Sequence, residues 1–234
     1  MEKYTLKVID IIDETDNTKT YFFEKPENLT WEPGSHTHIG HIGFDIGDQP
    51  TKEWVRHMSI TTLPEENKIA ITTRVPGSKS EFKNKLSELK IGDEAVFFKI
   101  GSRMGLRRIN KPIILISMGV GIATMRPLIL SFINDKTNIP YLSNINIDSS
   151  NKFVFKNQLD KLADDNYKNY WINSRKEFYE ILSQSMKSED AMYYVVGSDA
   201  FIKDIIQRLR ANNVKIDDIV IDRKDERKQK FLED

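Results

Sequence analysis

The sequence contains no cysteine. This absence excludes structural disulfides, Cys-ligated zinc, Cys-ligated iron–sulfur clusters and a thiol nucleophile within the chain. A surplus of charge of one sign is also missing, because 35 Lys and Arg residues balance 35 Asp and Glu residues. Proteins that bind nucleic acid normally carry a basic surplus to meet the phosphates. We therefore expect no nucleic-acid partner.

Long apolar runs are absent as well. No stretch approaches the roughly 18 apolar residues that cross a bilayer, and the charged segment 1–16 lacks the apolar core of a signal peptide. We therefore expect no membrane span and a cytoplasmic location. The 234 residues are 39% hydrophobic and 30% charged, a balance typical of one large or two small globular domains.

The first hundred residues consist of short β-prone segments separated by turn signals. Strands are expected at 4–10, 20–23, 35–44, 54–61, 68–75 and 94–100. A short amphipathic helix is expected at 79–89, where apolar residues recur at 82, 86 and 89. Strands at this spacing predict a small antiparallel barrel or sandwich, and we expect a six-stranded β-barrel.

From residue 112 the pattern changes to strands that alternate with helices. The apolar segment 112–118 is typical of a parallel strand covered on both faces. Further strands are expected at 139–147, 167–172 and 192–196, and helices at 123–134, 156–163, 176–186 and 200–211. This alternation predicts a parallel α/β domain with right-handed crossovers. We expect a β domain over 1–108, an α/β domain over 109–234, and a solvated or frayed end over 223–234.

The segment Arg56-His57-Met58-Ser59 lies on an expected strand. An arginine on a strand can hold a phosphate through two hydrogen bonds. Because side chains alternate along a strand, Arg56 and Met58 share one face, and His57 and Ser59 share the other. An exposed strand with a salt-bridged arginine is the alternative, since a tetrapeptide is a weak motif.

A second candidate phosphate-binding segment, Pro76-Gly77-Ser78-Lys79-Ser80, opens the expected helix of the β domain. The first turn of a helix offers unpaired N–H groups and a partial positive charge, which suit a phosphate. Ordinary N-capping by Ser78 or Ser80 is the alternative. Adjacent strands could bring this segment close to Arg56.

Two glycine turns follow expected strands of the α/β domain. Gly119-Val120-Gly121 follows the apolar strand, and Gly197 follows 192–196. We expect both at the carboxyl edge of one sheet, where ligands of such sheets bind. The first turn departs from the dinucleotide fingerprint, because Thr124 replaces Gly or Ala and no acidic residue ends the next strand. A glycine turn that only lets a ligand ring approach the backbone is the alternative.

The pair Ser174-Arg175 ends another expected strand. It could hold the 2′-phosphate of a nucleotide, or it could cap the following helix. Capping explains Ser174 but leaves Arg175 unexplained.

The histidines resemble a metal site only superficially. His36 and His38 share a strand face, but Asp45 is the only carboxylate near ligand spacing. We therefore expect ordinary strand-face histidines and no metal.

Taken in order, these segments resemble the ferredoxin/flavodoxin–NAD(P)H reductase superfamily over residues 4–222. In that family a β-barrel domain binds FAD through an R-x-Y-S motif, and an α/β domain binds NAD(P)H. The segments that carry the resemblance are 31–34, 56–60, 72–80, 89–93, 119–123 and 194–198.

The resemblance implies a role for individual residues. Ser59 would hydrogen-bond near flavin N5, and Gly119 and Gly197 would leave space for the nicotinamide. The other residues implied to contact FAD are Arg56, His57, Met58, Thr72, Thr73, Arg74, Gly77, Lys79 and Ser80. Those implied to contact NAD(P)H are Val120, Gly121, Ser174, Arg175 and Ser198. The pair Ser174-Arg175 favours NADPH, with NADH possible.

Three departures from the family pattern bear on activity. Met58 replaces the aromatic residue that stacks on the flavin, and Thr124 replaces the usual Pro. Val196 and Ser198 replace the Cys and Pro of the family's C-G-P motif, in which the Cys helps to place the nicotinamide. FAD binding is therefore better supported than fast oxidation of NAD(P)H.

The activity that the resemblance implies is a flavin-dependent transfer of electrons from NAD(P)H to a separate acceptor. The acceptor would be a ferredoxin- or flavodoxin-like protein or a ferric chelate. A siderophore–iron reductase shares this chemistry and differs only in its acceptor. The alternative from another class is a non-catalytic flavin- or nucleotide-binding sensor, or an electron-transfer subunit, with a degenerate NAD(P)H site.

Overall fold

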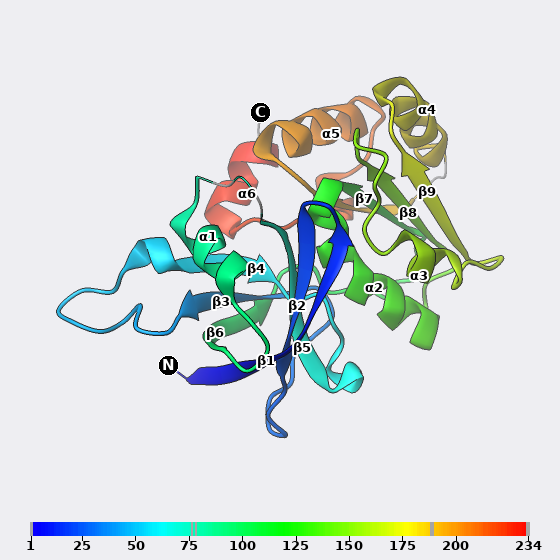
Figure 1. Cartoon of the computed structure of the whole chain (residues 1–234). Coiled ribbons are helices and arrows are strands. Elements are labelled where there is room, and N and C mark those ends of the chain that lie inside the picture. The colour runs from blue at the N-terminus through cyan, green and yellow to red at the C-terminus, as the bar shows by residue number, and fades with distance from the viewer. Residues whose placement is uncertain (1, 76, 78, 188–189, 233–234) are drawn as a thin grey trace. The chain divides into compact units, whose positions relative to one another are not determined.

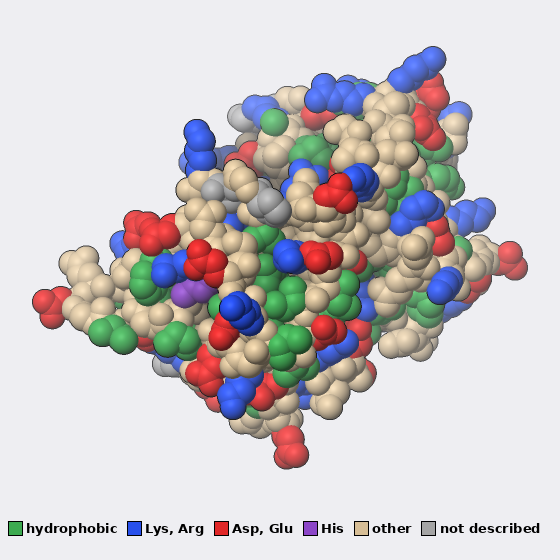
Figure 2. Space-filling model, in the orientation of Figure 1, with side chains coloured by type: hydrophobic (Ala, Val, Ile, Leu, Met, Phe, Trp, Pro, Cys, Tyr) green, Lys and Arg blue, Asp and Glu red, His purple; other side chains and the backbone are tan. Residues whose placement is uncertain are grey.

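The computed structural model describes residues 2–75, 77, 79–187 and 190–232 (Figure 1). The chain divides into two compact units, the first ending at Ser102 and the second beginning at Arg103. Lys and Arg side chains are interspersed with Asp and Glu side chains over the face seen in Figure 2. No helix among the described residues is long and apolar enough to cross a membrane.

The first unit is an antiparallel sheet that closes on itself. Its strands are β1 (Lys3–Thr15), β2 (Thr18–Glu24), β3 (Ser35–His41), β4 (Val55–Ser59), β5 (Lys68–Arg74) and β6 (Glu94–Ser102). Their order is β4-β3-β6-β1-β2-β5. The two outer strands meet where Thr61, just beyond β4, donates its N–H to the carbonyl oxygen of Ala70 in β5 at 2.8 Å. The predicted six-stranded barrel is confirmed.

Aromatic and branched side chains fill the interior of this barrel. Phe23 and Phe97 meet edge to face with ring centroids 4.8 Å apart. The helix α1 (Glu81–Glu88) buries Phe82 and Leu86 in the same core. Two 3-10 helices, η1 (Lys52–Trp54) and η2 (Pro64–Glu66), lie in the connections before β4 and β5.

The second unit is a five-stranded sheet in which all neighbouring strands are parallel. Its strands are β7 (Ile113–Met118), β8 (Leu142–Ile147), β9 (Tyr167–Ile172), β10 (Met192–Val196) and β11 (Ile219–Ile221), in the order β11-β10-β7-β8-β9. Its helices are α2 (Ile122–Asn134), α3 (Lys156–Asp160), α4 (Arg175–Ser185), α5 (Asp199–Ala211) and α6 (Asp225–Leu232), with 3-10 turns η3 (Gly119–Gly121) and η4 (Ile216–Asp218). The predicted parallel α/β fold is confirmed.

Helices cover both faces of the parallel sheet, and each face has its own core. Side chains of α2 and α3 pack on one face with Leu115 and Tyr194. Those of α4 and α5 pack on the other face with Ile116 and Val195. This burial on both sides explains the continuous apolar run of β7, because alternate side chains enter different cores.

The structure corrects the sequence prediction at three places. The strand β8 begins at Leu142 instead of residue 139, since Pro140 has no N–H for a ladder hydrogen bond. The short strand β11 was not predicted. The charged end is solvated as expected, with Lys224, Arg227 and Lys230 exposed, but it is helical instead of frayed: α6 occupies most of it, and Phe231 packs against the core under α5.

Candidate functional site

The two segments predicted to bind phosphate lie together in the first unit. The guanidinium of Arg56 on β4 donates through Nη2 to Ser80 Oγ, immediately before α1, at 3.1 Å. Its Nη1 donates to the carbonyl oxygen of Val55 at 2.7 Å, and the group lies over the Phe82 ring at 5.9 Å. The Arg56 side chain is therefore held in position at the start of α1.

Two further cations lie near Arg56. Burial lowers the pKa of the half-buried Lys83 ammonium, and the positive charges of Arg74 and Arg56 lower it further. These three groups come from α1, β5 and β4, and we call them the cation cluster. Like charges raise one another's free energy unless an anion lies among them. The cluster fits a phosphate or diphosphate group.

Sequence reasoning overlooked Lys83, although a signal was present. Lys83 is the third residue of α1, after the N-cap residue Ser80. A cation in the first turn of a helix is disfavoured by the helix dipole. The same turn carries an acidic residue, Glu81, and the helix N-terminus favours an anion beside it.

The other residues predicted beside the diphosphate have different surroundings. Thr72 is buried and shares a hydrogen bond with Thr20 through their hydroxyls at 2.8 Å. Thr73 is also buried, whereas Gly77 and Lys79 are exposed. Gly77 has φ +69°, a left-handed conformation that favours glycine. Pro76 and Ser78 lie outside the described residues.

The predicted alternation along β4 is seen directly. Met58 packs against the barrel core, on the Arg56 side of the strand. On the opposite face the exposed His57 ring lies against His36, with centroids 4.2 Å apart, and Ser59 pairs with His36 across the strands. Within the part of the chain that the structure describes, no three His, Asp or Glu side chains are arranged to hold a metal ion.

His41 connects the barrel to α1, the helix that carries Lys83 of the cation cluster. Its Nε2 forms a hydrogen bond with the carbonyl oxygen of Phe82 at 2.8 Å. Burial lowers the pKa of the His41 imidazole. This buried contact joins β3 to the first turn of α1.

In the second unit the two glycine turns lie side by side, as expected. The strands β7 and β10 are paired, with Ser117 opposite Val196. Gly119 has φ +56°, and a Cβ on Gly121 would lie 3.1 Å from the Val196 carbonyl oxygen. Glycine at 121 is therefore required by close approach of the two turns. Val120, between them, is half-buried.

The turn at Gly197 is packed by the chain's own side chains. A Cβ on Gly197 would lie 2.5 Å from a ring carbon of Phe201. Arg223, just beyond β11, donates through Nη2 to the Gly197 carbonyl oxygen at 2.9 Å and pairs with Asp199 at 2.8 Å. Sequence reasoning did not identify Phe201 or Arg223, because only the fold brings them to this turn.

A buried amide supports the first glycine turn. Asn146 Nδ2 donates to Ser117 Oγ at 2.8 Å and to the Gly119 carbonyl oxygen at 3.2 Å. The strand β8 ends at Ile147, so Asp148 directly follows it, contrary to the expectation that no acidic residue ends this strand. The Asp148 carboxylate accepts hydrogen bonds from the N–H and the hydroxyl of Ser150, so it stabilises the turn that follows β8.

Both serines predicted to contact NAD(P)H are helix caps. Ser174 Oγ accepts from the Glu177 N–H at 3.3 Å at the start of α4. Ser198 Oγ accepts from the Phe201 N–H at 3.2 Å at the start of α5. Capping satisfies these helix ends. Arg175 is exposed at the first position of α4.

No family model and no curated protein matches the chain by sequence. Solved structures do match it. The CS-b5R domains of human Ncb5or in the NAD+ form give a TM-score of 0.75 at 16% identity, covering 94% of this chain and 69% of that chain. A ferredoxin–NADP+ reductase from Neisseria gonorrhoeae with bound FAD and NADP gives 0.75 at 14% identity, covering 90% and 92%.

A third match is the flavohem-like FAD/NAD-binding domain of nitric oxide dioxygenase from Vibrio cholerae, with a TM-score of 0.73, 16% identity, and coverage of 93% and 97%. These likenesses extend over both units and define a class by fold. The chain has the two-domain fold of ferredoxin–NADP+ reductase-like FAD/NAD-binding domains. The resemblance seen in the sequence motifs is thus confirmed at the level of the fold.

Proposed function

We propose that this chain is a flavin-dependent oxidoreductase that passes electrons from NAD(P)H through FAD to a separate acceptor. The observation that carries the proposal is the cation cluster of Arg56, Arg74 and Lys83 beside the start of α1. A cluster of this kind suits the diphosphate of FAD, because each phosphate carries a negative charge and accepts the hydrogen bonds of a helix start.

The residues of the first unit divide into binding and positioning roles. Arg56 would exchange its bond to Ser80 Oγ for a phosphate oxygen, while Val55 keeps the guanidinium in place. Lys83 and Arg74 would complete the charge balance. Ser59 would hydrogen-bond near the reactive edge of the flavin, and Met58 would contact the ring in place of an aromatic side chain.

FAD held by the cation cluster would supply the chemistry of hydride acceptance from NAD(P)H and of single-electron donation to the acceptor. The carboxyl edge of the parallel sheet is the expected NAD(P)H site, since ligands of such sheets bind outside the ends of the strands. Gly119 and Gly197 would border the nicotinamide, and Arg175 would meet the 2′-phosphate of NADPH. A protein of this class would work in the cytoplasm with a redox protein or a ferric chelate as acceptor.

A second candidate function is a flavin-binding subunit that does not oxidise NAD(P)H quickly. Phe201 and Arg223 occupy the surroundings of Gly197, and Val196 and Ser198 stand where the family has Cys and Pro. Both observations favour a slow or absent hydride transfer. The two candidates share the FAD site and differ in the second unit.

The test of the FAD site uses Lys83→Met with Lys90→Met, an exposed lysine beyond α1, as the matched control. We expect Lys83→Met to weaken FAD binding and, without FAD, to raise the free energy of unfolding, because it removes cation repulsion. Titration with FAD and urea unfolding measure the two effects. Equal FAD affinity in both variants would contradict the proposal.

The absorbance spectrum under anaerobic NADPH then separates the two candidate functions. Yellow protein that bleaches supports the reductase. Yellow protein that stays oxidised supports the flavin-binding subunit. Colourless protein that binds no added FAD would exclude both.

A further inference from the structure

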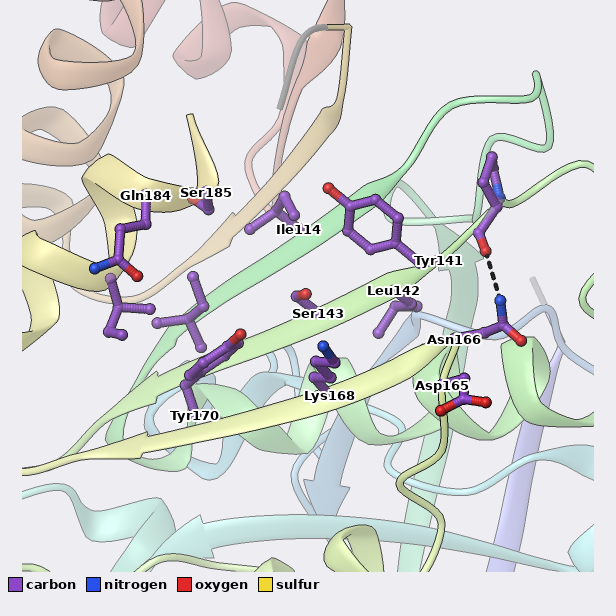
Figure 3. Close-up of a pocket in the computed structure, with 13 residues that line it drawn as sticks. Ile114, Tyr141, Leu142, Ser143, Asp165, Asn166, Lys168, Tyr170, Gln184 and Ser185 are labelled. Atoms are coloured by element: carbon purple, nitrogen blue, oxygen red, sulfur yellow. Dashed lines mark hydrogen bonds between the residues drawn. The ribbon is translucent and has the colours of Figure 1, made fainter. Parts of the chain in front are cut away.

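The second unit contains a cavity of about 400 Å³ at the amino ends of its strands (Figure 3). Its lining includes the second residue of three neighbouring strands: Ile114 of β7, Ser143 of β8 and Lys168 of β9. The last two residues of α4, Gln184 and Ser185, line it as well. This volume lies within the range of small-molecule sites. Neither the cation cluster nor the glycine turns contribute to it.

The cavity exists because of two local features of the fold. The helix α4 buries Phe178 and Leu182 on the sheet and ends at Ser185, so it leaves the starts of β8 and β9 uncovered. Ser143 occupies a buried position of β8 between larger side chains on the same face. A serine in place of a branched apolar residue leaves open space there.

The lining combines an apolar floor with two aromatic side chains. Ile114 and Ile145 form part of the floor. Tyr141 and Tyr170 lie on either side of Ser143 in the view of Figure 3. Phenol rings placed beside branched aliphatic side chains suit a flat aromatic ligand, which can pack on both.

The positive charge of the lining comes from Lys168, an exposed residue. In the view of Figure 3 its ammonium lies below Ser143 and beside Tyr170, and it forms no ion pair with any described residue. Asp165, the one carboxylate among the described residues of the lining, lies below Asn166 in Figure 3, on the side away from Tyr170. Asn166 itself is held by a hydrogen bond from its Nδ2 to the Pro140 carbonyl oxygen at 3.1 Å. An ammonium beside a hydroxyl favours an anionic ligand group.

We propose that this cavity binds a small aromatic carboxylate of one or two rings. The ring would pack between Tyr141 and Tyr170, and the carboxylate would accept from Lys168 and Ser143. The site is separate from the nucleotide edge of the sheet. Ile114 and Gly119 stand at opposite ends of β7, five residues and about 16 Å apart at the rise of a strand.

The probe for this site is 2-naphthoate, with neutral 2-naphthamide as the charge control. Binding to the full chain is measured by isothermal titration calorimetry and by ligand-observed NMR. We expect 2-naphthoate to bind at least about tenfold more tightly than 2-naphthamide, the size of one charge-assisted contact. Equal binding of the two compounds would overturn the assignment of Lys168.

Two variants and one competition locate the site. Lys168→Met should lose the preference for the carboxylate, whereas Lys161→Met, an exposed lysine outside the cavity, should retain it. Gln184→Trp at the exposed rim should fill the cavity and abolish binding of 2-naphthoate. Saturating FAD and NADPH should leave binding unchanged. Displacement by either nucleotide, or full binding by both Lys168→Met and Gln184→Trp, would refute the proposal.

Discussion

The cation cluster of the barrel and the glycine turns of the parallel sheet are both candidate nucleotide sites, yet they are built differently. In the barrel, burial lowers the pKa of Lys83, and the nearby charges of Arg74 and Arg56 lower it further. At the glycine turns, side chains of the protein already fill the close approaches, with Phe201 against Gly197 and Asn146 bonded to Gly119. The first region gathers cations from three separate elements near the start of α1, whereas the second is packed by side chains of the protein itself.

The two candidate cofactor regions of this fold are therefore constrained in different ways, one by charge and the other by packing. Under the proposed function, charge repulsion in the barrel would make FAD binding and stability oppose each other at Lys83. At position 197 the Phe201 ring lies where a Cβ would be, so the stability of the fold depends on glycine there. Substitutions in the two regions should therefore fail in different ways.

The largest effect is expected for Arg56→Ala. Loss of a charge-assisted contact to a phosphate should weaken FAD binding by about 1.5–3 kcal/mol, which is about 10- to 150-fold in Kd. Fluorescence titration of the apoprotein with FAD measures it, with Lys90→Ala as the control. An unchanged Kd for FAD would show that Arg56 does not bind the phosphate. The contrast between the two regions would then no longer hold.

The next effect concerns the glycine side of the comparison. Gly197→Ala should lower the free energy of unfolding by about 1–3 kcal/mol, because the new Cβ overlaps the Phe201 ring. Urea unfolding measures this loss. Gly101→Ala is the control, since its Cβ would meet nothing nearer than His36 at 3.9 Å. Equal stability of the two variants would show that the Phe201 ring moves aside at little cost and that packing does not constrain the turn at Gly197.

A smaller effect is expected at the exposed start of α4. Arg175→Ala should raise the KM for NADPH several-fold and leave the KM for NADH nearly unchanged, because only NADPH carries a 2′-phosphate. Steady-state reduction of ferricyanide with each nucleotide measures both constants. Ser174→Ala should instead lower stability by about 0.5–2 kcal/mol as a lost N-cap. Equal changes in the two KM values would exclude Arg175 from the 2′-phosphate site.

The smallest effect is a pH dependence of the contact between β3 and α1. Burial lowers the pKa of His41 below its ordinary value of 6.5, so the unfolded chain binds a proton there more readily than the folded chain. The stability that His41 contributes is therefore present above pH 6.5 and is lost as the pH falls below it. The difference in unfolding free energy between the wild type and His41→Gln should shrink between pH 7 and pH 5. A constant difference would show that His41 does not titrate on unfolding.

Much of the fold could be predicted because its signals are local. The apolar run of β7 and the alternation of strands with helices after it define a parallel sheet, and the strands β9 and β10 begin and end where predicted. The end of the chain was mispredicted for a physical reason. High charge favours solvation, but Phe231 supplies enough apolar contact with the core under α5 to hold α6 there.

The candidate site could be predicted where a single short segment carries the signal. It could not be predicted where residues distant in the sequence come together. The segment 76–80 was predicted to lie close to Arg56, and the structure joins Arg56 to Ser80 by a hydrogen bond. Lys83 was overlooked although its place in the first turn of α1 was a signal, and its closeness to Arg74 and Arg56 is set by the fold. The assignment of these residues to FAD stays a prediction.

The sequence by itself determined the element types and their order, because hydrophobic periodicity and turn residues act over a few neighbouring positions. It also determined which motifs stand at the ends of strands. Only the tertiary structure decided that three cations meet beside α1, that Phe201 requires glycine at 197, and that a short α4 leaves a cavity over Ser143. Each of these depends on residues from separate elements, and their distance is set by packing instead of by spacing along the chain.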